Sequence, residues 1–467
     1  MDREFELVVI GTGAAGSAAA EKARSWGHSV AIIEKDRLGG SCPNYACIPT
    51  KALLRSAHVY SLLKRASDFG LHFSGAGFDW NGIVNRKDRI VHGSGAATME
   101  ERFREMGIHL FRGAATFEDG EHVRVDGQVL TAGRVLIATG SQPALPRIAG
   151  IGAAKPITSR DAIGLSELPA SMIVVGAGPV GCEFAQLFST FDVPVALLEA
   201  QREILPGEEP ELAALVRRSL ESNGVTVLTR AHVLNLASDG RKKRVRVAVE
   251  QALREFSAEE ILIATGREAD VSGLNLEAAG VETEDGRIRV NEYLASSNPR
   301  IFAAGDAAGP YLYTHFASYQ GSLVPPNMFS KHPKKADYRV VPRVTFTEPE
   351  IASVGLTESK AEDEGYHAKA ALYPIAALGK ALVDSEDRGM VKLVADSRSG
   401  EILGGHIVAP HAGEMIHAIA TAMQVRAQVK DLAETIYAFP TYAQAINAAA
   451  GEWVEAHIRE QEKERHA

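Results

Sequence analysis

The sequence is poor in cysteine, with three in 467 residues, and it has no surplus of positive charge. So few cysteines argue against a framework of structural disulfides. The formal net charge of -9 gives no general attraction for nucleic acid or anionic lipid. The one dense basic run, RKKR at 241–244, follows Asp239-Gly240 and precedes an alternating stretch. We therefore interpret it as a solvent-exposed hairpin turn.

Long apolar runs are missing as well. None approaches the roughly 20 residues that span a bilayer. The N-terminus passes almost at once into a strand-like FELVVI, which leaves no room for a cleavable leader. We therefore expect a cytoplasmic protein without membrane or nucleic-acid partners. At 467 residues the chain exceeds one hydrophobic core, and we expect about three domains.

The sequence does contain an internal repeat. Residues 7–34 (LVVIGTGAAGSAAAEKARSWGHSVAIIE) return at 172–199 as MIVVGAGPVGCEFAQLFSTFDVPVALLE. Each copy reads as a strand, a GxGxxG turn, a helix and a second strand that ends in an acid, which is the context a dinucleotide-binding turn requires. Two glycine turns without a ligand are the alternative. The predicted ligands are Gly11, Gly13, Gly16 and Glu34 in the first copy, and Gly176, Gly178, Gly181 and Glu199 in the second.

Each glycine of the motif has a physical task. The first permits a tight turn, the second lets the backbone approach a pyrophosphate, and the third lets helix and strand pack. The diphosphate then lies at the positive end of the helix, and the acid accepts hydrogen bonds from a ribose. Two related segments, VLIATGSQP at 135–143 and ILIATGREA at 261–269, are expected to return the chain to each sheet.

Cys42 and Cys47 lie together in GGSCPNYACIPTK, at 39–51. A zinc site needs four ligands, and this segment offers no further cysteine and no histidine, so we weigh a redox pair against two inert thiols. A redox pair requires Cα atoms about 4.4–6.8 Å apart. Residues five apart in a regular helix are farther apart, so we expect a distorted segment that leads into a helix. The start of that helix and the charge of Lys51 favour a thiolate.

Two dinucleotide sites beside a cysteine pair suggest electron transfer through two cofactors. A nicotinamide delivers a hydride, a disulfide takes two electrons through a thiolate, and a flavin can connect the two. Cys42 follows Glu34 by only eight residues, so we place FAD in the first site and the nicotinamide in the second. Because Glu199 would repel a 2′-phosphate, we expect NADH rather than NADPH. Arg202 is the residue that could blur this preference.

These motifs resemble those of the class I flavoprotein pyridine nucleotide-disulphide oxidoreductases, the group of dihydrolipoamide dehydrogenase, glutathione reductase and mercuric reductase. The resemblance also includes AAGD at 303–306 and VTFTEPEIASVGLTE at 344–358. It implies that Cys42 exchanges with substrate and that Cys47 forms the charge-transfer thiolate. It further implies that Lys51 pairs with Glu183 near the reactive end of the flavin. The other candidate cofactor residues are Gly40, Ser41, Ala115, Thr139, Gly140, Val233, Gly266, Arg267, Asp306 and Ala317.

The expected fold class is α/β, with two Rossmann-like dinucleotide-binding domains and a C-terminal α+β dimerisation domain. We assign residues 1–150 and 273–335 to the FAD domain, 151–272 to the NAD domain and 340–467 to the interface domain. The stretch VPPNMFSKHPKK, at 324–335, is interpreted as a proline-rich, basic linker before the last domain. The resemblance implies a homodimer, because the interface domain normally completes the partner's site.

The sequence departs from the family pattern near its C-terminus. Members that reduce disulfides carry a histidine there, followed by a glutamate, and the histidine protonates the leaving thiolate. The corresponding stretch here is YAFPTYAQAI, with Phe439 at the histidine position and Gln444 at the glutamate position. Phenylalanine cannot carry a proton, so this acid-base step has lost its usual agent. Tyr437 and Tyr442 flank the position, although such tyrosines more often serve packing.

We therefore expect an enzyme that passes electrons from NADH through FAD to a Cys42–Cys47 disulfide and on to a small disulfide or a metal ion. The alternatives are a dihydrolipoamide dehydrogenase, a diaphorase-type quinone or dye reductase, a mercuric reductase-like metal reductase, and a flavin-binding sensor with slow turnover. No resident metal is expected, because His406, His411 and His417 follow no zinc spacing. The third cysteine, Cys182, is interpreted as a small buried residue.

Overall fold

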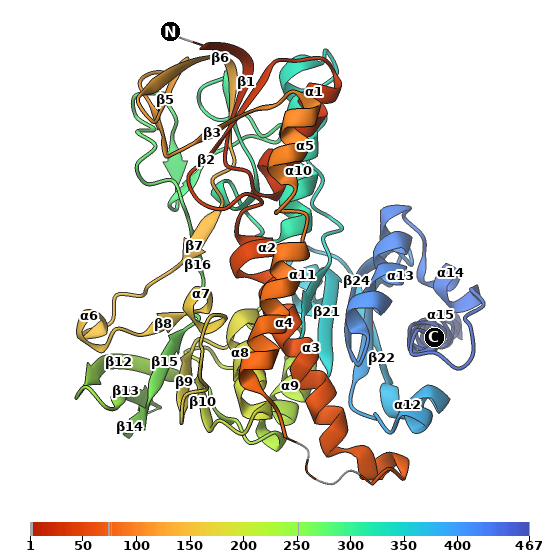
Figure 1. Ribbon diagram of the computed structural model, residues 1–467. Coiled ribbons are helices and arrows are strands. Elements are labelled where there is room, and N and C mark those ends of the chain that lie inside the picture. Colours follow the sequence, from red (N-terminus) through yellow and green to blue (C-terminus); the bar gives the residue numbers. More distant parts are fainter. Residues whose placement is uncertain (1–2, 73–74, 76, 251, 467) are drawn as a thin grey trace.

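The computed structural model describes residues 3–72, 75, 77–250 and 252–466. The chain forms three main bodies, and the first contains segments from before and after the second (Figure 1). The N-terminal sheet lies at the top of Figure 1, the second dinucleotide unit at the lower left, and the C-terminal sheet with its helices at the right. The long helix α3 runs between the last two bodies. No described helix has the length and apolarity needed to cross a membrane.

The first sheet has the strand order β3-β2-β1-β6-β5-β4, and β19 pairs with β6. Its centre is parallel, and β4 and β5 add an antiparallel edge. All of β2 is buried, as expected for a strand covered on both faces. The strands are β1 (Arg3–Ile10), β2 (Val30–Glu34), β3 (His109–Arg112), β4 (Ala115–Phe117), β5 (His122–Val125), β6 (Gln128–Ile137) and β19 (Ile301–Ala303).

Helices α1 (Ala14–Ser25) and α10 (Thr314–Phe329) pack closely on this sheet (Figure 1). A Cβ at Gly321 would lie 2.2 Å from the carbonyl oxygen of Ala15, so only glycine allows this approach. The sequence prediction of a linker at 324–335 was wrong in its first half, because α10 continues through Pro325 and Pro326. Both prolines are buried, and this packing compensates for the backbone hydrogen bonds that proline cannot donate.

The second sheet is entirely parallel, in the order β11-β10-β9-β15-β8. Its strands are β8 (Ile157–Thr158), β9 (Met172–Val175), β10 (Val195–Leu198), β11 (Thr226–Leu228) and β15 (Glu260–Ile263). An antiparallel meander of β12 (Ala231–Ser238), β13 (Lys243–Val249) and β14 (Ala252–Ala258) follows β11. The turn between β12 and β13 holds the start of the basic run, which confirms the predicted hairpin.

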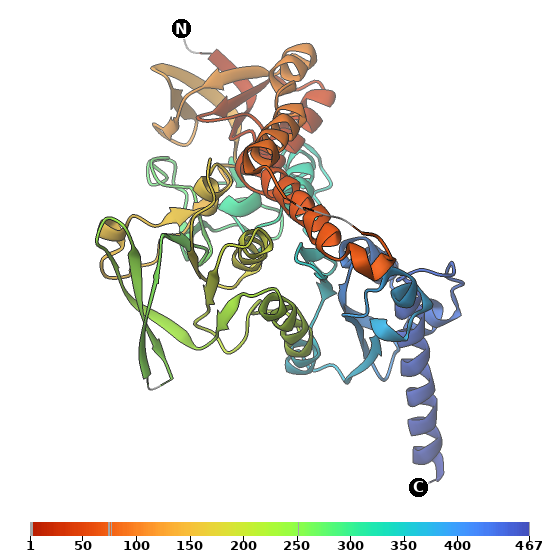
Figure 2. The same ribbon diagram turned by 60° about the horizontal axis from the view of Figure 1, so that its bottom comes forward.

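The C-terminal sheet is antiparallel, in the order β20-β21-β24-β23-β22. Its strands are β20 (Arg343–Thr345), β21 (Glu350–Gly355), β22 (Ala368–Pro374), β23 (Met390–Asp396) and β24 (Ile402–Ala409). The helices α13 (Ala412–Gln424), α14 (Val429–Glu434) and α15 (Gln444–His466) belong to the same body. Figure 2 shows the blue end of α15 projecting away from it. Two parallel dinucleotide sheets and a C-terminal α+β body confirm the predicted fold class.

The remaining elements complete these bodies or connect them. The helices are α2 (Ser41–Tyr45), α3 (Cys47–Lys64), α4 (Trp80–Gly93), α5 (Met99–Met106), α6 (Ile151–Ala154), α7 (Ser159–Ala162), α8 (Pro179–Thr190), α9 (Pro210–Ser222), α11 (Glu358–Asp363) and α12 (Gly379–Asp384). The short strands are β7 (Ser141–Pro143), β16 (Arg267–Ala269), β17 (Thr283–Glu284) and β18 (Arg287–Ile288). β7 pairs with β16, which ties the first dinucleotide unit to the second.

Candidate active site

The two cysteines lie on either side of a helix break. Cys42 is in α2, and Cys47 is the first residue of α3. Ala46 separates the two helices with φ -134° and ψ -94°, well outside the helical region. The amide of Asn44 steadies α2 by donating to the carbonyl oxygens of Leu38, at 2.8 Å, and Gly40, at 2.9 Å. The distortion predicted for this segment is therefore present.

The two thiols are partly exposed and polarise each other. Hydrogen bonding from Cys42 lowers the pKa of Cys47 to about 6, and Thr314 and Lys51 act in the same direction. The same contact, together with burial, raises the pKa of Cys42. Of the two thiols, Cys47 therefore ionises at the lower pH.

Lys51 connects the redox segment to the second dinucleotide unit. Its Nζ lies 2.9 Å from Oε1 and 2.7 Å from Oε2 of Glu183, a buried carboxylate on α8. Glu183 also accepts the backbone N–H of Phe346 at 3.0 Å, and the Phe346 ring lies 4.7 Å from Lys51 Nζ. Residues from all three bodies therefore meet beside Cys47.

The glycines of the two GxGxxG turns have matching surroundings. Gly11 has φ +105°, and a Cβ there would lie 2.3 Å from the carbonyl oxygen of Ala138. A Cβ at Gly16 would lie 1.9 Å from the carbonyl oxygen of Gly11. At Gly13 it would meet no protein atom within 4 Å, so this backbone faces open space. The second turn repeats the pattern. A Cβ would lie 2.5 Å from a carbonyl oxygen at Gly176 and 1.9 Å from one at Gly181, and at Gly178 it would meet no protein atom within 4 Å.

The acid at the end of each second strand closes its turn in the same way. One carboxylate oxygen accepts a backbone N–H from the glycine turn, and the other accepts the N–H two residues beyond the acid. In the first unit the donors to Glu34 are Thr12 at 3.0 Å and Asp36 at 2.8 Å. In the second unit the donors to Glu199 are Ala177 at 2.7 Å and Gln201 at 2.8 Å. Arg202 is exposed.

Two adjoining cavities run from Glu34 to the cysteines. One, of about 320 Å³, is lined by Glu34, Ala115 and Thr139. The other, of about 210 Å³, is lined by both cysteines and by Lys51, Asp306 and Ala317. Both are lined by Gly13, Ser41, Gly140, Ser141 and Arg267.

The donors along these cavities fit a flavin dinucleotide. In the part of the chain that is described, Thr139 Oγ1 is a buried hydroxyl with no hydrogen-bond partner. Gly40 brings the redox segment against the first turn, since a Cβ there would lie 2.8 Å from the Cα of Gly13. An elongated ligand with its ribose at Glu34 and its diphosphate at Gly13 would reach Cys47 at its other end.

Arg267 and Val233 lie in different surroundings, although both belong to the stretch 151–272 that we assign to the NAD domain. Arg267 donates from Nε to Oγ of Ser141 at 2.8 Å and from Nη2 to its carbonyl oxygen at 2.7 Å. Ser141 Oγ in turn donates to Asp306. Arg267 therefore belongs to the first dinucleotide site, by its contacts. Val233 on β12 is half-buried and packs in an apolar cluster, and Gly266 has φ +128°.

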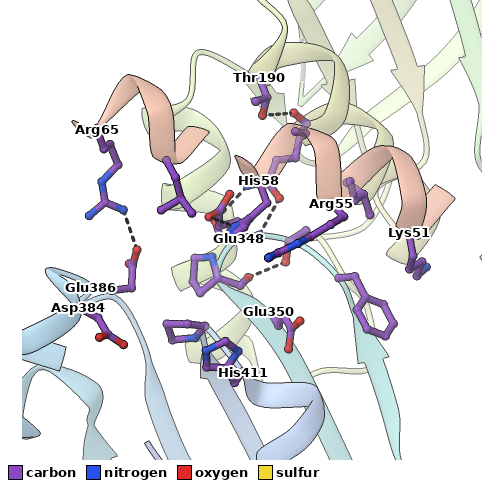
Figure 3. Close-up of a pocket in the computed structure, with 18 of the residues that line it drawn as sticks. Lys51, Arg55, His58, Arg65, Thr190, Glu348, Glu350, Asp384, Glu386 and His411 are labelled. Carbon is purple, nitrogen blue, oxygen red and sulfur yellow. Dashed lines mark hydrogen bonds and ion pairs between the residues drawn. The ribbon is translucent and has the colours of Figure 1, made fainter. Parts of the chain in front are cut away.

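A wider cavity, of about 490 Å³, lies between α3 and the C-terminal body, with Lys51 among its lining residues (Figure 3). His58 Nδ1 lies 2.5 Å from Glu348 Oε1. Burial raises the pKa of Glu350 to about 7, and the N–H of Gly413 donates to this carboxyl at 2.9 Å. Sequence reasoning did not predict that His58, Glu348 and Glu350 lie around one cavity, because no local motif relates α3 to β21.

The altered acid-base position lies at the surface of the chain. The Phe439 side chain is 78% exposed and lies beside Gly379. Gln444 begins α15, and its side-chain oxygen accepts the N–H of Thr441 at 3.2 Å. Tyr442 is buried and stacks edge-on against His411, with ring centroids 5.9 Å apart.

The remaining predicted candidates are packing residues by their surroundings. His406 is fully buried between Ser353 Oγ and the carbonyl oxygen of Leu356, both at 3.0 Å. Cys182 is fully buried within α8. Across the described ranges, no group of three or more His, Cys, Asp and Glu residues has a geometry that could hold a metal ion.

Comparison with known proteins gives full-length matches. The family model described as pyridine nucleotide-disulphide oxidoreductase matches residues 5–322, and the dimerisation-domain model of the same family matches residues 341–450. A mercuric reductase of Staphylococcus aureus is 34% identical over 450 residues, which cover 96% of this chain and 82% of the relative. A dihydrolipoyl dehydrogenase of Bacillus subtilis (strain 168) is 34% identical over 466 residues, which cover 96% and 98%.

Among solved structures, the Cu(II) complex of the HOCl-induced flavoprotein disulfide reductase RclA from Escherichia coli is similar, with a TM-score of 0.86 and 27% identity. The match covers 97% of this chain and 99% of that one. The chain therefore belongs to the class I pyridine nucleotide-disulphide oxidoreductases, flavoproteins that use FAD and a nicotinamide nucleotide, and it carries the dimerisation domain of that family.

Proposed function

We propose that this enzyme passes two electrons from NADH, through FAD and the Cys42–Cys47 pair, to a thiophilic metal ion or a small activated disulfide. The observation that carries the proposal is the geometry of the pair, because Cys42 and Cys47 lie on either side of the helix break at Ala46 and line one cavity with Lys51. The pKa shifts of the two thiols, lowered at Cys47 and raised at Cys42, support it. Bound FAD supplies the chemistry that accepts a hydride and reduces a disulfide. The side chains around its cavities bind it and hold its reactive end near Cys47.

The proton balance supports an acceptor that needs no histidine. Reduction of the disulfide adds two electrons, Cys47 stays a thiolate, and Cys42 takes up one proton. A metal ion bound by the sulfurs takes the two electrons, with one Hg(II) or two Cu(II) ions reduced, while the sulfurs return to the disulfide and the Cys42 proton passes to solvent. No leaving group then needs a proton, and an activated disulfide releases a stable thiolate. The replacement of the histidine by Phe439 therefore has little effect on the reduction of such acceptors. Two of the three named proteins support this choice, since one is a mercuric reductase and the RclA structure is a Cu(II) complex.

We also infer that the active enzyme is a homodimer and that it prefers NADH. The segment from Ile436, 97% exposed, to Phe439, 78% exposed, presents apolar side chains on the dimerisation domain, and burial against a second copy would remove them from water. The preference for NADH follows from Glu199, whose charge at the end of β10 would repel a 2′-phosphate.

A second candidate, direct reduction of quinones by the flavin, would need neither cysteine. The test compares Cys42→Ser, Cys47→Ser and, as a matched control, Cys182→Ser, with NADH oxidation measured against Cu(II), Hg(II), an activated aromatic disulfide and a small quinone. We expect both active-site variants to lose metal-ion and disulfide reduction and to keep quinone reduction, while the control keeps all three. Unchanged metal-ion and disulfide rates in Cys42→Ser would refute thiol chemistry.

A further inference from the structure

An ion pair lies where the larger of the two flavin cavities opens to solvent. Nη2 of Arg160 donates to Oδ2 of Asp36 at 2.8 Å, and both residues line this cavity. Their side chains are 52% and 44% exposed, whereas Glu34, which lines the same cavity two residues before Asp36, is buried. Residues that are both exposed and part of the lining mark the mouth of a cavity, so the pair stands at its mouth.

Tyr45 joins this pair and makes it a cluster of three side chains. Its hydroxyl donates to Oδ1 of Asp36 at 3.0 Å. The guanidinium carbon of Arg160 lies 3.7 Å from the centroid of its ring, the geometry of a cation–π contact. Arg160 therefore holds Asp36 through its charge and covers Tyr45 with its plane. Because Tyr45 is the last residue of α2, the cluster also contacts the redox helix.

The members of this cluster come from different dinucleotide units. Asp36 and Tyr45 follow β2 of the first sheet, whereas Arg160 lies in α7, directly after β8 of the second sheet. A second ion pair follows the same pattern, since Nζ of Lys35 lies 2.6 Å from Oδ2 of Asp270 after β16, and both line the cavity. The mouth can open fully only if these contacts between the units break.

The backbone that carries Arg160 is itself held in place. α7 begins with a capping box, in which Thr158 and Asp161 each accept a backbone N–H of the other. Ser159, next to Arg160, lines both flavin cavities. The guanidinium group is thus presented to the cavity by an ordered turn of the second unit.

We propose that Arg160 is a positioning residue that holds the FAD site closed: it binds Asp36 and Tyr45 from the second unit, so that FAD leaves only when the two dinucleotide units move apart. The proposal requires only the FAD that this family uses, and it is independent of the acceptor that the enzyme reduces. Nothing in the local sequence signals this role, because Arg160 and Asp36 are 124 residues apart.

The test measures how fast FAD leaves the loaded enzyme, as the rise in free-flavin fluorescence after strong dilution. Arg160→Met keeps a long side chain and removes the charge and the planar group. We expect release to become about tenfold faster, as for loss of an exposed ion pair together with a cation–π contact. Arg160→Lys keeps the charge without the plane and should give an intermediate rate. An unchanged rate in Arg160→Met would overturn the proposal.

The matched control is Arg289→Met. It breaks an equally exposed ion pair, with Glu282 at 2.8 Å, and Arg289 is not among the described residues that line the two flavin cavities. FAD release from this variant should remain at the wild-type rate. Release as fast as in Arg160→Met would show that any lost surface pair has this effect, which would also overturn the proposal.

Two further readouts separate closure of the site from a general loss of stability. Salt screens exposed ion pairs, so about 0.5 M KCl should accelerate release from the wild type and change Arg160→Met little. Adding Asp36→Asn to Arg160→Met should not accelerate release further, because both substitutions remove one contact, and multiplied effects would contradict the proposal. The helical circular dichroism of Arg160→Met should match the wild type. Loss of this signal in step with FAD would assign the effect to unfolding and refute closure by Arg160.

Discussion

In the first dinucleotide unit the chain leaves Glu34 and enters the redox helices within eight residues, whereas in the second it leaves Glu199 and runs to α9, which packs on the C-terminal sheet. The glycine turns before these acids are closely similar. A Cβ at the first glycine would lie 2.3 Å from a backbone carbonyl oxygen in the first unit and 2.5 Å from one in the second. Backbone sterics thus fix the turn, and the segment after the acid determines what each unit does.

The two units also meet the C-terminal body differently. The first does so through α3, by the partly exposed pair of His58 and Glu348 and by Arg65 after the helix, which pairs with Glu386. The second does so through Lys392, a buried lysine on β23 that lies 3.0 Å from Glu209 and 2.6 Å from Glu211 at the start of α9. The NAD-side unit is therefore fixed by a buried ionic cluster, and the FAD-side unit by weaker contacts around a cavity.

The largest effect should come from the third glycine of either turn. In Gly16→Ala and Gly181→Ala the new Cβ would lie 1.9 Å from a backbone carbonyl oxygen, and we expect a loss of about 5 kcal/mol or more in the free energy of unfolding. Urea unfolding measures it. Gly13→Ala and Gly178→Ala are the matched controls, which should fold normally and lose FAD or NADH binding. Equal stability in all four variants would contradict the steric account of the turns.

The second prediction compares the two contacts with the C-terminal body. Lys392→Met leaves Glu209 without its buried partner, and removal of one member of a buried pair costs about 3–5 kcal/mol. His58→Ala breaks an exposed pair and should cost about 1 kcal/mol or less. Chemical unfolding at neutral pH gives both values. If Lys392→Met lost less unfolding free energy than His58→Ala, the His58 pair would be the stronger contact and the prediction would be wrong.

Glu350 gives the third prediction, which depends on pH. Burial raises its pKa from the ordinary 4.5 to about 7 in the folded protein. Between these values the unfolded chain binds fewer protons than the folded one, so stability falls as pH rises and stays low above 7. Glu350→Gln should remove this loss, which reaches about 3 kcal/mol. Unfolding at pH 5 and pH 8 in both proteins measures it, and parallel pH profiles would count against it.

The smallest effects are expected from substitution of the two acids that close the turns, Glu34 and Glu199. Glu34→Gln loses part of the hydrogen bonding that closes the first turn, and FAD affinity should fall about tenfold. Glu199→Gln should raise KM for NADH by a similar factor, narrow the preference over NADPH and leave FAD in place. Fluorescence of released FAD and steady-state kinetics separate the two. If either variant showed both defects, the two sites would not be independent.

The parts of the site that the sequence predicted are those with a local signal. Glycine spacing and a terminal acid define each turn, and the distortion between Cys42 and Cys47 follows from their separation. The pairing of Lys51 with Glu183 came from family resemblance alone. Thr314, Glu350 and the contact of Arg267 with Ser141 could not be predicted, because they depend on segments more than sixty residues apart that meet only in the folded chain.

The predicted linker failed for a related reason. Two adjacent prolines and a run of basic residues usually indicate the end of a helix. Here Pro325 and Pro326 are buried, the neighbouring Val324 and Met328 pack in one cluster with α1 and the first sheet, and this packing outweighs the local preference. The altered position at Phe439 was visible in the sequence, but the 78% exposure of its side chain could be seen only in the folded chain.

Helix α3 connects Cys47 to the C-terminal body. Its 18 residues extend over about 27 Å, from Cys47 at one end to the neighbourhood of Arg65 at the other. Arg65 is anchored to the C-terminal body through Glu386 at 2.9 Å and through the carbonyl oxygen of Ser385 at 2.5 Å. If α3 moves as a rigid body, any movement of the C-terminal body on acceptor binding would also displace the sulfur of Cys47.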